Sequence, residues 1–150
     1  MPTADISEQI KQQMGEKWLP HIYAQRVLRV RTRLYRFAKP RPTACITIQH
    51  TLLGIELKIG RQRLLCPDLA TARYLSIFAR VGCQEIAIPY DITKISHLAD
   101  EFESSWYRML LLVEQYGQKQ TDRFAARLRR LLFANIRDEL LAADGARSKD

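Results

Sequence analysis

A long stretch of this sequence is rich in basic residues and has no acidic residue. Between Glu16 and Glu56 there is no Asp or Glu at all. The basic residues in this stretch are Lys17, Arg26, Arg29, Arg31, Arg33, Arg36, Lys39 and Arg41. Cationic side chains are rarely buried without a partner, so most of these should face solvent. The chemistry predicted here is anion binding, and the anion can be nucleic-acid phosphates, lipid headgroups, an acidic protein surface or counter-ions.

A second row of arginines lies along one side of a helix predicted over residues 121–141. The row consists of Arg123, Arg127, Arg130 and Arg137. If both rows face the same way, they form a continuous basic surface that neutralises several phosphates, and nearby aromatic rings can stack on unpaired bases. The candidate anion-binding residues are Arg29, Arg31, Arg33, Arg36, Arg41, Arg127 and Arg130.

Acidic residues are concentrated in the second half of the chain and offer the arginines another use. They include Asp100, Glu101, Glu103, Glu114, Asp138 and Glu139. Pairing within the chain or between subunits would neutralise the basic surface. The acidic segment 100–103, followed by Trp106, also presents a surface for a partner protein or a second copy of the chain. The candidate partner-binding residues are Asp100, Glu101, Glu103 and Trp106, although a tryptophan at such a helix position belongs more often to the core.

The catalytic motifs are weak. Glu56-Leu57-Lys58 matches the acid-x-Lys step that metal-dependent nucleases carry on a strand. Such a site needs a second carboxylate upstream, where this chain has none, because one Glu gives a divalent cation too few oxygen ligands. The alternative is a half-exposed strand with Glu56 and Lys58 outward. The three histidines form no nucleophile and base pair, and the glycine spacing fits no phosphate-binding loop. We predict no catalytic residue, no metal ligand and no cofactor, with a nuclease as a distant alternative.

Composition predicts a single domain over residues 1–150. With 150 residues of which 47% are hydrophobic, the chain can bury a core without metals or disulfides. Its net charge of +8 favours encounters with polyanions. No apolar run approaches the roughly 18 residues of a membrane span, so we expect a cytoplasmic protein with no transmembrane segment. Cys45, Cys66 and Cys83 are odd in number and lie among apolar neighbours, which predicts buried, reduced thiols.

The first 37 residues give ambiguous structural signals. Over residues 5–17, apolar residues spaced by four predict a short amphipathic helix or a flexible arm within residues 1–20. Residues 23–37 fit a helical wheel, but basic residues also alternate with apolar and β-branched ones over 29–34. That alternation favours a strand, and both alternatives stay open.

The sheet signal is strongest between residues 44 and 65. Residues 45–48 alternate, residues 53–59 are apolar except for Glu56 and Lys58, and Gly60 begins a turn before another apolar run. We predict an antiparallel meander there. Residues 85–88 form a short apolar strand after a helix, and we expect it to return to the same sheet by a crossover.

Helices are predicted over three later segments. Asp68 opens the first and Gly82 closes it, and Asp91 precedes the most regular one, which begins at residue 92. The third covers 121–141, and residues 145–150 are predicted as a polar tail.

Together these elements predict an α+β fold: a small, mainly antiparallel β-sheet of about four or five strands with a β-α-β crossover, packed against about three C-terminal helices. The expected function is a non-catalytic cytoplasmic binding protein whose Arg-rich face engages an anionic macromolecule, with nucleic acid, DNA or RNA, as the first choice. The alternative is a protein-interaction adaptor or assembly subunit with complementary basic and acidic faces, including a homo-oligomer.

Overall fold

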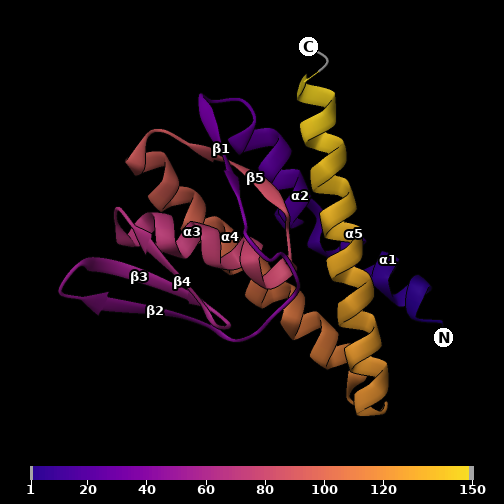
Figure 1. The fold of residues 1–150 in the computed structure, drawn as a ribbon. Helices are drawn as coiled ribbons and strands as arrows, with labels where there is room; N and C mark the ends of the chain where they lie inside the picture. The colour runs from indigo at the N-terminus through magenta and orange to yellow at the C-terminus, as the bar shows by residue number, and fades with distance from the viewer. Residues whose placement is uncertain (1, 149–150) are drawn as a thin grey trace.

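Two small antiparallel sheets and several helices form an α+β fold in the computed structural model, which describes residues 2–148 (Figure 1). The strands are β1 Thr32–Arg36, β2 Ile46–Thr51, β3 Gly54–Ile59, β4 Gln62–Cys66 and β5 Glu85–Pro89. The helices are α1 Thr3–Met14, α2 Leu19–Ile22, α3 Leu69–Val81, α4 Ile92–Gly117 and α5 Asp122–Ser148. A 3-10 turn, η1 Gly15–Lys17, and a π-helical turn, η2 Tyr23–Val27, link the first elements. The predicted α+β class is confirmed.

The antiparallel meander β2-β3-β4 lies where the sequence predicted it. Leu57 in the central strand is fully buried, opposite Ile48 on one side and Leu64 on the other. Helix α3 packs against this apolar face. Side chains alternate across a strand, so the other face carries Glu56 and stays open to solvent.

Strand β5 does not join the meander, so the predicted crossover within one sheet is wrong. It pairs instead with β1 in a separate two-stranded antiparallel sheet, with Leu34 opposite Ala87. At the outer edge of β5, the Ala87 N–H donates to the Tyr23 hydroxyl at 3.0 Å, and the Tyr74 hydroxyl donates to the Ala87 carbonyl at 2.7 Å. Pro89 has no N–H to offer. The outer edge of β5 therefore has no groups left at Ala87 to pair with another strand.

The N-terminal third contains both of the structures that the sequence left open for residues 23–37, a helical turn and a strand. Residues 32–36 are a strand, as the alternation favoured, but residues 23–27 form a π-helical turn, so only the later part of the ambiguous segment joins a sheet. Tyr23 and Val27 are fully buried within that turn. Helix α1 buries Ile6 and Ile10 in the core, so this part of the predicted arm is a packed helix.

The later helices begin where their caps predicted. The Asp68 carboxylate accepts a bond from the Thr71 N–H at 2.7 Å at the start of α3, and Gly82 ends α3 with φ +87°. Asp91 caps α4 in the same way. No helix of the described residues is long and apolar enough to cross a membrane.

Helix α5 is longer than predicted and runs through residues 145–148, which the sequence assigned to a polar tail. Arg147 donates to the Val30 carbonyl at 3.0 Å and to the Thr32 hydroxyl at 2.7 Å. These bonds fix the last turn against the chain entering β1. The rest of the predicted tail, residues 149–150, lies outside the described residues.

Candidate anion-binding site

All of the candidate anion-binding arginines are exposed. They are Arg29, Arg31, Arg33, Arg36, Arg41, Arg127 and Arg130. Two of them have neighbours: Arg36 lies 3.8 Å from a Glu85 oxygen, and the Arg31 guanidinium lies 5.0 Å from the centre of the Tyr90 ring. Exposed contacts of this kind are worth at most about 1 kcal/mol, so they leave both cations available. The others form no ion pair with any residue that the structure describes.

The strand geometry distributes the first row of arginines over two faces. Successive side chains of a strand point to opposite sides, so Arg33 shares one face of β1 with Tyr35 while Arg36 lies on the other. A nucleic acid on one face of β1 therefore contacts only part of this row.

The two rows of arginines also lie apart. Arg147 contacts the chain at the start of β1, whereas Arg130 lies 17 residues earlier on α5, which is about 25 Å along the helix. Figure 1 shows α5 as one long helix along the side of the molecule, with its C-terminal end near β1. The two rows do not form one continuous stripe.

Another group of cations lies where the segment 39–43 passes the turn between β3 and β4. Lys39, Arg41 and Arg61 line a hollow of about 450 Å³, and none of the described residues that line it is acidic. We call these three residues and the space between them the basic hollow. The Gly60 N–H donates to the Cys45 carbonyl at 2.8 Å, which ties the turn to the segment. Pro40 and Pro42 restrict the segment to extended conformations that leave its side chains free to face the hollow.

Sequence reasoning selected Arg41 but not Lys39 or Arg61 as site residues. Residues 39–41 and 61 are twenty residues apart in the chain, and their meeting depends on the path of the segment over the turn. The one local signal was that each lies beside a turn residue, Pro40 or Gly60.

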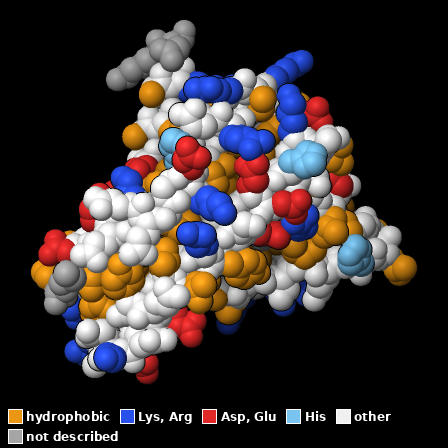
Figure 2. All heavy atoms as spheres, turned by 180° about the vertical axis from the view of Figure 1, so that it is seen from behind, with side chains coloured by type: hydrophobic (Ala, Val, Ile, Leu, Met, Phe, Trp, Pro, Cys, Tyr) orange, Lys and Arg blue, Asp and Glu red, His pale blue; other side chains and the backbone are white. Residues whose placement is uncertain are grey.

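The candidate partner-binding carboxylates are engaged within the chain. Arg73 donates to Glu103 at 2.8 Å and also pairs with Asp100, and Arg26 pairs with Glu101. Figure 2 shows a face on which Lys and Arg side chains lie interspersed with Asp and Glu side chains. The acidic surface predicted from sequence is thus largely neutralised by neighbouring cations.

Trp106, the fourth of these candidates, is 4% exposed and stacks on Phe133, with 5.1 Å between ring centres. Its side chain therefore belongs to the interior of the protein and is not part of the outer surface.

The acid-x-Lys step lies on β3 as the half-exposed strand alternative predicted, with Leu57 inward and Glu56 3.8 Å from Arg63. Among residues 2–148, no three His, Cys, Asp or Glu side chains group closely enough to hold a metal ion.

The cysteines divide into one exposed and two buried thiols, all free. Cys45 is exposed, contrary to the prediction, because it precedes β2 and the inward position falls to Ile46. Burial raises the pKa of the Cys83 thiol to about 12 and also raises that of Cys66. Since the thiolate is the reactive form, neither buried cysteine is suited to nucleophilic chemistry.

Comparison with protein-family models, with curated proteins and with solved structures finds no match to this chain.

Proposed function

We propose that this chain is a non-catalytic binding protein that holds nucleic acid at the basic hollow, with the exposed arginines of β1 extending the contact. The observation that carries the proposal is that Lys39, Arg41 and Arg61 line one hollow, with no carboxylate among the described residues that line it. Charge convergence of this kind opposes folding by mutual repulsion unless an anion relieves it.

Phosphate is the anion that best matches these side chains. A guanidinium group donates two parallel bonds to phosphate oxygens, and a lysine adds a point charge. Each phosphate neutralised releases counter-ions, so several weak contacts add up to substantial affinity at low salt. Arg29 and Arg33 are exposed, form no ion pair with any described residue and precede the same segment in the chain, so they are further candidates for phosphate contacts.

The test is a fluorescence anisotropy titration with single- and double-stranded oligonucleotides at two salt concentrations. The variant K39A/R41A/R61A removes the hollow's cations, and K94A/R108A/K119A removes three exposed cations elsewhere, so both carry the same net charge. We expect the hollow variant to lose tenfold or more in affinity and the control to lose about threefold or less. Equal losses, or no salt-sensitive binding below about 100 μM, would refute the proposal, because ordinary non-specific binding is tighter than that.

We also propose a cytoplasmic location for this binding. Support comes from the three free cysteines, because proteins of oxidising compartments seldom leave an exposed thiol such as Cys45 unpaired.

A protein-interaction or assembly subunit is the second candidate function, and one observation favours it. Leu52 and Leu53, at the tip of the β2–β3 hairpin, are 107% and 84% exposed. Two adjacent leucines in water are a natural contact for another protein chain. Light scattering at moderate salt tests it: an oligomer that L52S/L53S converts to a monomer supports this function, and a monomer in both proteins opposes self-assembly.

A further inference from the structure

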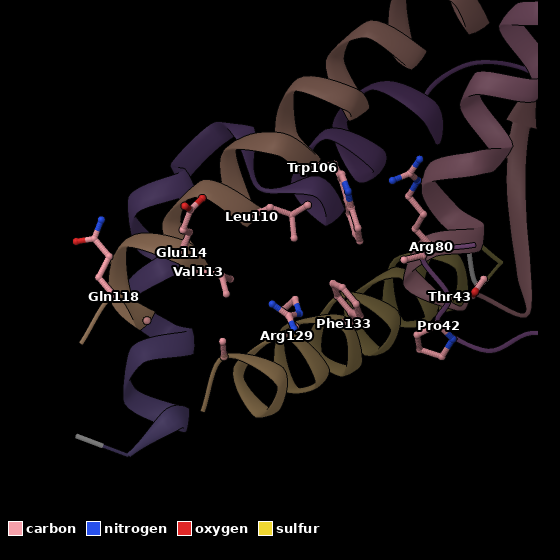
Figure 3. A pocket seen from close by; sticks show the side chains of 13 residues that line it. Pro42, Thr43, Arg80, Trp106, Leu110, Val113, Glu114, Gln118, Arg129 and Phe133 are labelled. Carbon is pink, nitrogen blue, oxygen red and sulfur yellow. The ribbon is translucent and has the colours of Figure 1, made fainter. Parts of the chain in front are cut away.

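A cavity of about 710 Å³ opens between α4 and α5 (Figure 3). Thr43 lines both this cavity and the basic hollow, so the two are neighbours. Its size falls in the range of small-molecule sites, roughly 300–1,000 Å³. Helix α4 contributes Trp106, Leu110 and Val113 on one side, and α5 contributes Phe133 and Arg129 on the other. We call this cavity the α4–α5 pocket.

Two buried hydrogen-bond donors belong to residues that line this pocket and have no partner among the residues that the structure describes. They are the Nε of Arg80, from the last turn of α3, and the Nε1 of Trp106. Buried polar atoms in proteins almost always have a partner. The other tryptophan follows that rule: Trp18 Nε1 donates to Glu139 at 3.2 Å. Both orphaned atoms are donors, so what they lack is an acceptor.

The acceptor should carry negative charge. Arg80 forms no ion pair with any described residue, and it lines the same end of the pocket as Trp106 in Figure 3. Arg129 lines the pocket from α5 and is also without an ion pair among the described residues. Glu114 lies at the opposite end, and its carboxylate points out of the pocket in this view. The charge of a ligand therefore belongs at the Arg80 end.

The other side chains that line the pocket favour a ligand whose main part is apolar. Leu110 and Val113 present aliphatic side chains, and the Phe133 ring stacks on Trp106, with the two rings inclined by 23°. A phosphodiester chain would place charges along these walls and leave them without a partner. A molecule charged at one end alone avoids that cost.

The structure also explains why Arg80 is held there. Gly82 follows Arg80 by two residues, and a Cβ at Gly82 would lie 2.6 Å from Pro42. That close approach packs the end of α3 against the segment containing Pro42 and Thr43, which closes this end of the pocket.

We infer that the α4–α5 pocket binds a small organic carboxylate with an apolar body, whose carboxylate oxygens accept from Arg80 Nε and Trp106 Nε1. This is a second binding site, different in chemistry from the basic hollow although Thr43 lines both.

The experiment compares decanoate, decanol and decylamine, which share a chain length and differ in charge. Each ligand is titrated by displacement of the fluorescent probe 1-anilinonaphthalene-8-sulfonate from the full chain. We expect decanoate to bind at least tenfold more tightly than the other two, because a hydrogen bond to a charged group contributes about tenfold or more.

Variants locate the binding. R80M removes the charge and the donor, and W106F keeps an aromatic wall but removes the indole N–H. We expect R80M to weaken decanoate binding tenfold or more and W106F to weaken it about fivefold or more, with decanol binding changed by less than twofold. R108M, an exposed arginine on α4 outside the pocket, is the matched control and should behave as wild type.

Equal affinity for decanoate and decanol in the wild-type protein would overturn the inference, as would no decanoate binding below 1 mM. Decanoate binding unchanged by R80M would also overturn it. If R80M does not fold, R80K takes its place: the inference then requires decanoate to bind at least threefold more weakly, since lysine lacks the Nε donor at that position.

Discussion

Tyr23 joins three parts of the fold through one buried hydroxyl group. This hydroxyl accepts the Ala87 N–H of β5 and donates to the Asp144 carboxylate of α5 at 2.6 Å, from a ring that is fully buried. Tyr23→Phe keeps the ring but leaves the Ala87 N–H without its acceptor. An unsatisfied buried group costs about 1–3 kcal/mol, so we expect the free energy of unfolding to fall by that amount in urea denaturation.

Tyr107→Phe is the control for that measurement, because Tyr107 is 61% exposed and should change stability by less than about 0.5 kcal/mol. Equal small effects of the two substitutions would show that the Tyr23 hydroxyl does not close the edge of β5.

Asp144 should make stability depend on pH. Burial raises the pKa of Asp144 above its ordinary value of 3.8, although the bond from Tyr23 acts to lower it. The folded state therefore holds this proton more tightly than the unfolded state. The contribution of Asp144 to stability is present in full below pH 3.8 and is lost as pH rises through the folded pKa.

Asp144→Asn tests this sign, because the amide oxygen can still accept from Tyr23 but does not titrate. The unfolding free energy of D144N relative to wild type should be higher at pH 7 than at pH 4, both measured in urea. Asp138→Asn, an exposed position on the same helix, is the control. A D144N advantage that shrinks with rising pH would contradict the burial argument.

Individual residues show what sequence can and cannot predict about a site. Exposure of Arg29, Arg33 and Arg41 was predictable, because burying an unpaired guanidinium is costly at any position. Which side chains lie beside one another in the fold was not predictable from the sequence. Arg73 and Arg80 lie two turns apart on α3, yet Arg73 is paired with two carboxylates while Arg80 lines a pocket and has no ion pair among the described residues. The difference arises because α4 supplies the carboxylates that pair with Arg73, and the sequence of α3 alone does not show which residues of α4 will lie beside it.

At the scale of elements, the parts specified by local signals were predicted well. Asp68 and Gly82 bound α3 because a cap and a left-handed residue act within one turn of the helix. Strand β5 was recognised as a strand but assigned to the wrong sheet. Its pairing is decided by Tyr23 and Tyr74, which close its outer edge from more than ten residues away. Alternation within a strand carries no information of that kind.

The packing of the end of α3 against the segment that contains Pro42 can be tested by a substitution at Gly82. Its φ of +87° is unfavourable for any residue with a Cβ, and that Cβ would also meet Pro42 at 2.6 Å. We expect Gly82→Ala to lower the unfolding free energy by about 2–4 kcal/mol, from backbone strain and the clash together. Gly60→Ala shares the positive φ, +58°, but has open space around it, so it should cost only about 1 kcal/mol. Equal costs would mean that the contact with Pro42 is loose.

Across the whole molecule, the net charge of +8 is distributed unevenly. Arg26 and Arg73 form ion pairs with carboxylates of α4, and Figure 2 shows one face of the molecule on which charges of both signs are mixed. The basic hollow, by contrast, contains positive charge only. A polyanion steered by the overall charge is therefore expected to settle at the hollow rather than at an arbitrary basic residue.

The salt dependence of oligonucleotide binding separates contact with the cations of the basic hollow from steering by the overall charge. Each phosphate neutralised contributes about 0.7 to the slope of log K against log salt for single strands and about 0.9 for duplex DNA. If Lys39, Arg41 and Arg61 each neutralise one phosphate, removing all three should reduce the slope by about 2 for single strands and nearly 3 for duplexes. The control K94A/R108A/K119A lowers the net charge equally but should leave the slope within about 0.5, because steering without contact releases few counter-ions. Slopes that fall equally in the two variants would mean that binding follows net charge alone, and the hollow would then have no special role.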